Sequence, residues 1–197
     1  MNKLHVTKGS AKMEGIYSIN TPSSENPFCQ MMAKSDAICR SCYAMRFESF
    51  RKHLVPAFKR NMKLLLSKDY IPEMFSFKFM RLHSYGELFG YVHFVSFVKL
   101  AVFNKDTNFT LWTKRKHIIH DYLRKGGIIP SNLFLVYSNP VIDNEVKRVP
   151  KGFNKVFNVF TKEGSENVEI NCGNKKCIDC RLCYTSNSVS VINEHKK

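Results

Sequence analysis

Seven cysteines are the residues of this chain best suited to chemistry, and they form two groups near its ends. The first group contains Cys29, Cys39 and Cys42, and the second contains Cys172, Cys177, Cys180 and Cys183. Cysteines that only fill a core would be scattered along the sequence. Clustered cysteines in a reducing compartment are more often metal ligands or catalytic thiols than disulfides. We therefore predict that all seven bind metal.

The spacing within each group suggests which metal centre it holds. The second group reads Cys-x4-Cys-x2-Cys-x2-Cys, and such short steps are typical of loops around iron–sulfur clusters. We predict one or two [4Fe–4S] clusters, with zinc as the alternative, although zinc sites usually pair two separate knuckles. The first group has three thiols, which would leave one iron open to a substrate. Alternatively, Cys29 binds no metal, and Cys39 and Cys42 share one metal centre with the second group.

Polar residues beside predicted strand ends could complete an active site. His83 and Glu87 follow an apolar strand and could act as an acid–base pair. The alternatives are that His83 only donates a hydrogen bond nearby and that Glu87 caps the following helix. Tyr43, Arg81 and Lys114 are predicted to bind the cofactor, and the two basic residues add positive charge to the same region.

The elements that must position these residues alternate between apolar strands and helices. Strands are predicted over 15–21, 75–82, 109–114, 133–140 and 156–161, and helices over 48–67, 90–105 and 115–127. Pro56 should kink or divide the first helix. The alternation predicts an α/β fold whose parallel sheet forms an open or partial barrel. We expect a single domain, residues 1–197, with cysteine-rich loops at 29–42 and 172–183 on the same rim.

Charge and hydropathy restrict the partners and the location. The formal net charge of +15 favours a partner that carries phosphate, either nucleic acid or a phosphorylated small molecule. The alternative is that the charge serves solubility. The longest apolar run, 89–103, contains His93 and Lys99 and is too short for a membrane span. The first twelve residues have no apolar core typical of a signal peptide. We expect a cytoplasmic protein that does not enter membranes.

Two resemblances extend this interpretation. "CRSCYA" follows the first predicted strand and resembles the cluster loop of radical S-adenosylmethionine enzymes, except that nine residues separate Cys29 from Cys39, where those enzymes have three. That resemblance implies S-adenosylmethionine as a cofactor. Over most of its length the chain resembles the phage gene product 88 family, in the segments "SSENPFC", "CRSCYA", "MRLHSYGELF", "FTLWTK" and "CGNKKCIDCRLCY". This second resemblance implies a phage origin, hence the host cytoplasm, and a cysteine-bound centre.

Three classes of function follow from these observations. The first is an enzyme whose cluster has an open iron and performs radical or Lewis-acid chemistry. The second is a basic nucleic-acid-binding protein with a structural iron–sulfur or zinc centre. The third is a closed electron-transfer or regulatory module. The polar strand ends beside the thiols favour the enzyme.

Overall fold

A single sheet of seven strands, with its strands in chain order, organises the computed structural model, which describes residues 3–173 and 175–196. The strands are β1 (Val6–Lys8), β2 (Tyr17–Ile19), β3 (Phe79–Leu82), β4 (Asn108–Thr113), β5 (Leu133–Ser138), β6 (Lys155–Phe160) and β7 (Val191–His195). β1 pairs antiparallel with β2, and every later pair is parallel. β1 and β7 are the two edges, so the sheet is open.

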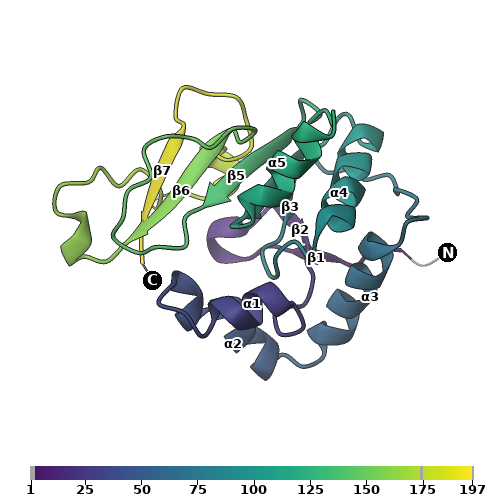
Figure 1. Ribbon diagram of the computed structural model, residues 1–197, viewed down its shortest axis with the longest axis horizontal. Coiled ribbons are helices and arrows are strands. Elements are labelled where there is room, and N and C mark those ends of the chain that lie inside the picture. Colours follow the sequence, from purple (N-terminus) through teal and green to yellow (C-terminus); the bar gives the residue numbers. More distant parts are fainter. Residues whose placement is uncertain (1–2, 174, 197) are drawn as a thin grey trace.

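Helices connect the parallel strands. They are α1 (Pro27–Met32), α2 (Tyr43–Phe50), α3 (Leu54–Leu66), α4 (Tyr91–Phe103), α5 (Lys116–Arg124) and the short α6 (Cys177–Cys180). α1, α2 and α3 lie between β2 and β3, and α4 and α5 provide the next two crossovers. Figure 1 shows α4 and α5 in front of the sheet, with α1 and α2 along the lower edge of the molecule.

The two faces of the sheet are built from alternating residues and have different coverings. Met80 and Leu82 of β3 and Leu111 of β4 are fully buried in one apolar cluster with Phe97 of α4 and Ile119 of α5. Their neighbours along the strands point to the opposite face because side chains alternate in a strand. α3, α4 and α5 therefore cover one face of the sheet and leave the other to a different part of the chain.

The C-terminal cysteine segment, residues 172–190, covers this opposite face. The ring of Tyr184 packs edge-on against Phe79 of β3, with centroids 5.8 Å apart. Thr110 of β4 donates a 2.8 Å hydrogen bond from its hydroxyl to the carbonyl of Cys183. The segment between α6 and β7 thus replaces helices as the second layer.

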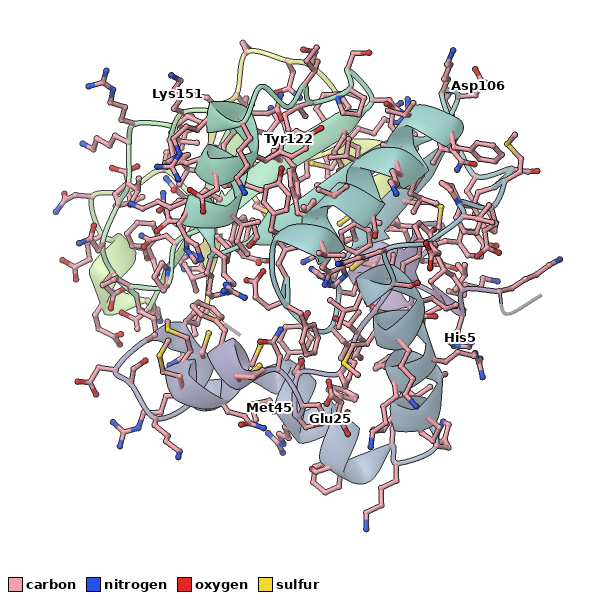
Figure 2. All side chains as sticks on the ribbon, turned by 45° about the vertical axis from the view of Figure 1, so that its right-hand side comes forward. His5, Glu25, Met45, Asp106, Tyr122 and Lys151 are labelled. Atoms are coloured by element: carbon pink, nitrogen blue, oxygen red, sulfur yellow. The ribbon has the colours of Figure 1, made fainter. Side chains whose placement is uncertain are left out.

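The carboxyl ends of the strands lie at one end of the molecule. Asp106 and Lys151 precede β4 and β6, and Figure 2 shows both along the upper side of the molecule. Glu25 and Met45 follow β2, and they lie along the lower side in the same view. The first cysteine group, between Glu25 and Met45, therefore lies at the carboxyl end of the sheet.

The α/β class and the mostly parallel, open sheet are confirmed, but a barrel is not, because the sheet ends at two free edges. The prediction missed β1 and β7. The helix predicted over 48–67 is two helices, and the break falls at residues 51–53 rather than at Pro56. Pro56 lies in the first turn of α3, where its missing N–H leaves no hydrogen bond unmade. Within the described residues, no helix is long and apolar enough to cross a membrane.

Candidate metal centre

The first cysteine group is held by a loop that leaves β2 and enters α1. Asn26 caps α1, since its side-chain oxygen accepts a 3.0 Å hydrogen bond from the Phe28 backbone N–H. The same side chain donates to the carbonyl of Glu87 at 2.9 Å, which attaches the loop to the segment after β3. Cys29 lies in α1, Cys39 lies in a 3-10 turn, and Cys42 directly precedes α2 at its N-cap position.

These three thiols converge near one acidic and one basic side chain. Burial raises the pKa of Cys29, and the charges of Glu87, Cys42 and Cys39 raise it further. Burial also raises the pKa of Cys39, while Lys114 lowers it. Lys114 is anchored by a 3.2 Å hydrogen bond from its ammonium group to the hydroxyl of Ser138. A cation next to the thiols favours their thiolate forms, which are the forms that bind metal.

Glu87 joins the ends of two neighbouring strands. Its buried carboxylate accepts hydrogen bonds from Leu88 N–H at 2.8 Å, from the Thr113 hydroxyl at 2.6 Å and from Lys114 N–H at 2.8 Å. These contacts fix the carboxylate beside Cys29 and Cys39. The structure therefore places Glu87 next to the first cysteine group, and its predicted catalytic role stays a prediction.

His83 makes a different set of contacts from Glu87. Its ring packs against His93 and Phe97 of α4, with both centroid distances 5.1 Å, and it is buried. Burial and the nearby charges of His93 and Arg81 hold its pKa well below the usual range. The structure thus places a neutral His83 among the side chains of the helix-covered face. It does not pair His83 with Glu87.

The second cysteine group surrounds a cavity of about 780 Å³ on the opposite face of the sheet. All four of its cysteines line this cavity, together with Lys12 and Tyr184. Lys12 donates a 3.1 Å hydrogen bond to the sulfur of Cys172 and also binds Glu194. Burial raises the pKa of Cys183 to about 12, although the charge of Arg81 acts in the opposite direction.

Arg81 lies beside the second cysteine group. Its guanidinium carbon is 4.1 Å from the ring centroid of Trp112, which is a cation–π contact. Burial would lower the pKa of Arg81, but the charges of Tyr43, Tyr184, Cys183 and Cys177 raise it. Tyr43 itself is exposed and donates a hydrogen bond to the Ser84 carbonyl. Of the predicted cofactor residues, Arg81 thus lies by the second group and Lys114 by the first.

The seven thiols separate into a group of three and a group of four. The cysteines that influence Cys29 and Cys39 belong to the first group, and those that influence Cys177 and Cys183 belong to the second. All seven are free thiols. Among the described residues, no three His, Cys, Asp or Glu side chains are arranged to hold a metal ion, so metal ligation stays a prediction.

Only part of the second group reaches the rim where the first group lies. The first group lies at the strand ends, as expected, but the second extends over the sheet, from Glu194 in β7 to Thr110 in the middle of β4. Sequence reasoning also missed Lys12. It contacts a cysteine 160 residues away, and nothing in its local sequence distinguishes it from the other basic residues.

The fold and these two groups define an α/β protein with an open, mostly parallel sheet and two separate cysteine-rich sites. The chain belongs to the gene product 88 family, whose sequence profile matches residues 2–196. The family resemblance is therefore confirmed, whereas the likeness to radical S-adenosylmethionine enzymes rests on the first loop alone. No curated protein and no solved structure matches the chain.

Proposed function

We propose that this protein is an iron–sulfur enzyme with two clusters. In this proposal the second cysteine group binds a [4Fe–4S] cluster through four thiolates. The first group binds another through three thiolates and leaves one iron open to substrate. The observation that carries the proposal is the separation of the seven thiols into a set of four and a set of three. Four thiolates complete the ligands of a cubane, and three do not.

The charges around each group fit bound thiolates. Lys12 contacts Cys172, Arg81 influences Cys177 and Cys183, and Lys114 influences Cys39. Several thiolates in one partly buried place repel one another unless cations lie nearby. Each group has such a cation, which supports a negatively charged centre at both places.

The first group has the features expected of the reacting centre. A cluster with an open iron can supply Lewis-acid or one-electron chemistry when it is bound. Lys114 would hold an anionic group of the substrate, since the hydrogen-bond partner of its ammonium group is the neutral hydroxyl of Ser138. Glu87 keeps the Lys114 backbone in place through its 2.8 Å hydrogen bond. S-adenosylmethionine is one candidate co-substrate for such a site.

The test is to purify the protein without oxygen and to measure iron, sulfide and zinc per chain. We expect about eight irons and eight sulfides, because each cubane contains four of each. Cys180→Ser and Cys42→Ser should each lower both values by about half, since each variant removes a ligand from one group only. Zinc without sulfide would overturn the proposal.

Two further outcomes separate the parts of the proposal. About four irons, lost in Cys180→Ser and retained in Cys42→Ser, would restrict the cluster to the second group and favour a closed electron-transfer module. A change in the paramagnetic resonance spectrum of the reduced protein on adding S-adenosylmethionine, absent in Cys42→Ser, would support radical chemistry. An unchanged spectrum would overturn the proposal of radical chemistry and favour Lewis-acid chemistry.

A further inference from the structure

We infer that the exposed face of α2 binds single-stranded nucleic acid. The face consists of Tyr43, Phe47 and Phe50, whose exposed fractions are 55%, 39% and 76%. Aromatic residues with this spacing lie on one side of a helix and normally face the core. Here the buried side of α2 carries Ala44 and Glu48 instead. The helix is therefore turned so that its aromatic stripe faces solvent.

Specific contacts hold α2 in this orientation. The buried carboxylate of Glu48 accepts hydrogen bonds from the backbone N–H groups of Ser23 at 2.7 Å and Ser24 at 2.9 Å. The ring of Tyr85 packs edge-on against two rings of this face. Its centroid is 5.8 Å from that of Tyr43 and 6.2 Å from that of Phe47. The rings of Tyr43 and Phe47 are thus held in place before a partner arrives, which lowers the entropy cost of binding.

The charges beside the stripe are suited to a polyanion. Arg46, Arg51 and Lys52 are exposed, and the guanidinium carbon of Arg51 is 5.1 Å from the ring centroid of Phe47. The one acidic residue in the α2 sequence is Glu48, which is buried. Aromatic rings that stack on bases, next to cations that contact phosphates, are the features that bind single-stranded nucleic acid.

Other occupants fit this surface less well. A second copy of the chain would bring its own formal charge of +15 to the contact, and that repulsion opposes self-association. Duplex nucleic acid keeps its bases stacked, so they are not free to stack on protein side chains. The inference goes beyond the proposed function because the surface requires no cluster. However, α2 begins directly after Cys42, so a bound strand would lie next to the first cysteine group.

The test is fluorescence anisotropy with labelled single strands of about 20 nucleotides, long enough to span one binding face. DNA and RNA strands of the same sequence would show which sugar is preferred. We expect saturable binding that weakens steeply between about 50 and 200 mM salt. The double variant Phe47→Ala/Phe50→Ala should weaken binding at least ~10-fold, because it removes two of the rings on which bases would stack.

Matched controls lie at the other end of the molecule. Phe103, at the end of α4, is 48% exposed, and Lys105 next to it is also exposed. Phe103→Ala should leave the affinity within about twofold, and Lys105→Ala should weaken binding less than Arg51→Ala does. Equal losses of affinity in the α2 variants and the control variants would overturn the inference, and so would the absence of saturable binding at low salt.

Two accompanying measurements keep the interpretation clear. Circular dichroism and iron content should be the same in the double variant and the wild type, because the exposed rings contribute little to folding. A protein with its full iron content but no affinity for single strands would disprove this inference and leave the proposed function intact. A dimer that the double variant abolishes, with unchanged nucleic-acid affinity, would assign the surface to self-association instead.

Discussion

The two cysteine groups differ in what surrounds them, although burial raises thiol pKa values in both. The first group lies on short helices at the strand ends, and its loop leads directly into the exposed aromatic face of α2. The second group lies against the sheet, where Cys183 packs into two apolar clusters, one with Val136 and Phe157 and one with Phe79 and Tyr184. Cys172, Cys177 and Cys183 of the second group therefore pack against the core, whereas the first group lies at the strand ends.

This difference suggests that the second group serves mainly stability and the first group serves mainly contact with a partner. A centre inside the core cannot be removed without disturbing the packing around it. A centre at the edge is accessible to a partner and contributes less to stability. Substitutions in and around each cysteine group test this difference.

The largest expected effect is a stability difference between Cys183→Ser and Cys29→Ser. Cys183→Ser removes a proposed ligand and places a hydroxyl between two apolar clusters, so we expect it to lower the free energy of unfolding by ~3 kcal/mol or more. Cys29→Ser should cost about 1 kcal/mol or less. Urea denaturation without oxygen measures both values. Equal losses in the two variants would mean that the groups are equally structural.

A smaller effect is expected for Glu87→Gln. An amide keeps one acceptor oxygen, but its NH₂ group cannot accept from Lys114 N–H, so one of the three hydrogen bonds is lost. We expect a loss of about 2 kcal/mol in urea denaturation. The control is Glu166→Gln at an exposed position, which should change stability by less than about 0.5 kcal/mol. If the two variants behave alike, Glu87 does not tie β3 to β4.

Per histidine and per pH unit, the helix-covered face gives the smallest effect, and it contains no proposed ligand. Burial lowers the pKa of His93 to about 3, from 6.5 when exposed, and lowers that of His83 as well. Below pH 6.5 the unfolded chain therefore binds protons that the folded protein does not, and stability falls as the pH falls toward 3. The slope is at most ~1.4 kcal/mol per pH unit for each histidine.

Urea denaturation at several pH values between about 7.5 and 5 measures this slope. His93→Gln should reduce it, because one of the two buried histidines is removed. His120→Gln, at an exposed position of α5, should leave the slope unchanged. A wild-type protein whose stability is constant over this range would contradict the burial of a neutral pair.

Sequence patterns predicted the central strands well and the edges poorly. Apolar runs such as LFLVYS mark buried parallel strands, and β5 occupies that run. β1 and β7 read VTK and VINEH, and such short, partly polar stretches form strands only because a neighbour provides hydrogen bonds. The cysteine spacing likewise predicted both groups, but it did not reveal that one of them covers the sheet.

The site could be predicted only where its residues are close in the sequence. Lys12 and Glu194 are 182 residues apart and bind each other beside Cys172. No local pattern connects residues so far apart, because their contact depends on how the whole sheet brings β7 toward the N-terminal segment. The sequence also did not predict that His83 is buried and neutral, since a histidine after a strand also fits an active site.

The C-terminal layer also determines the order in which the protein can mature during synthesis. Residues 172–190 are translated after most of the sheet, yet they supply the partners of Phe79 and Thr110. Until then this face of the nascent chain is uncovered, and it is prone to aggregation. Contacts between distant parts of a chain also form slowly. In the proposed metal-bound form, loading of the second cysteine group would therefore coincide with the last step of folding, and metal supply would affect the yield in expression.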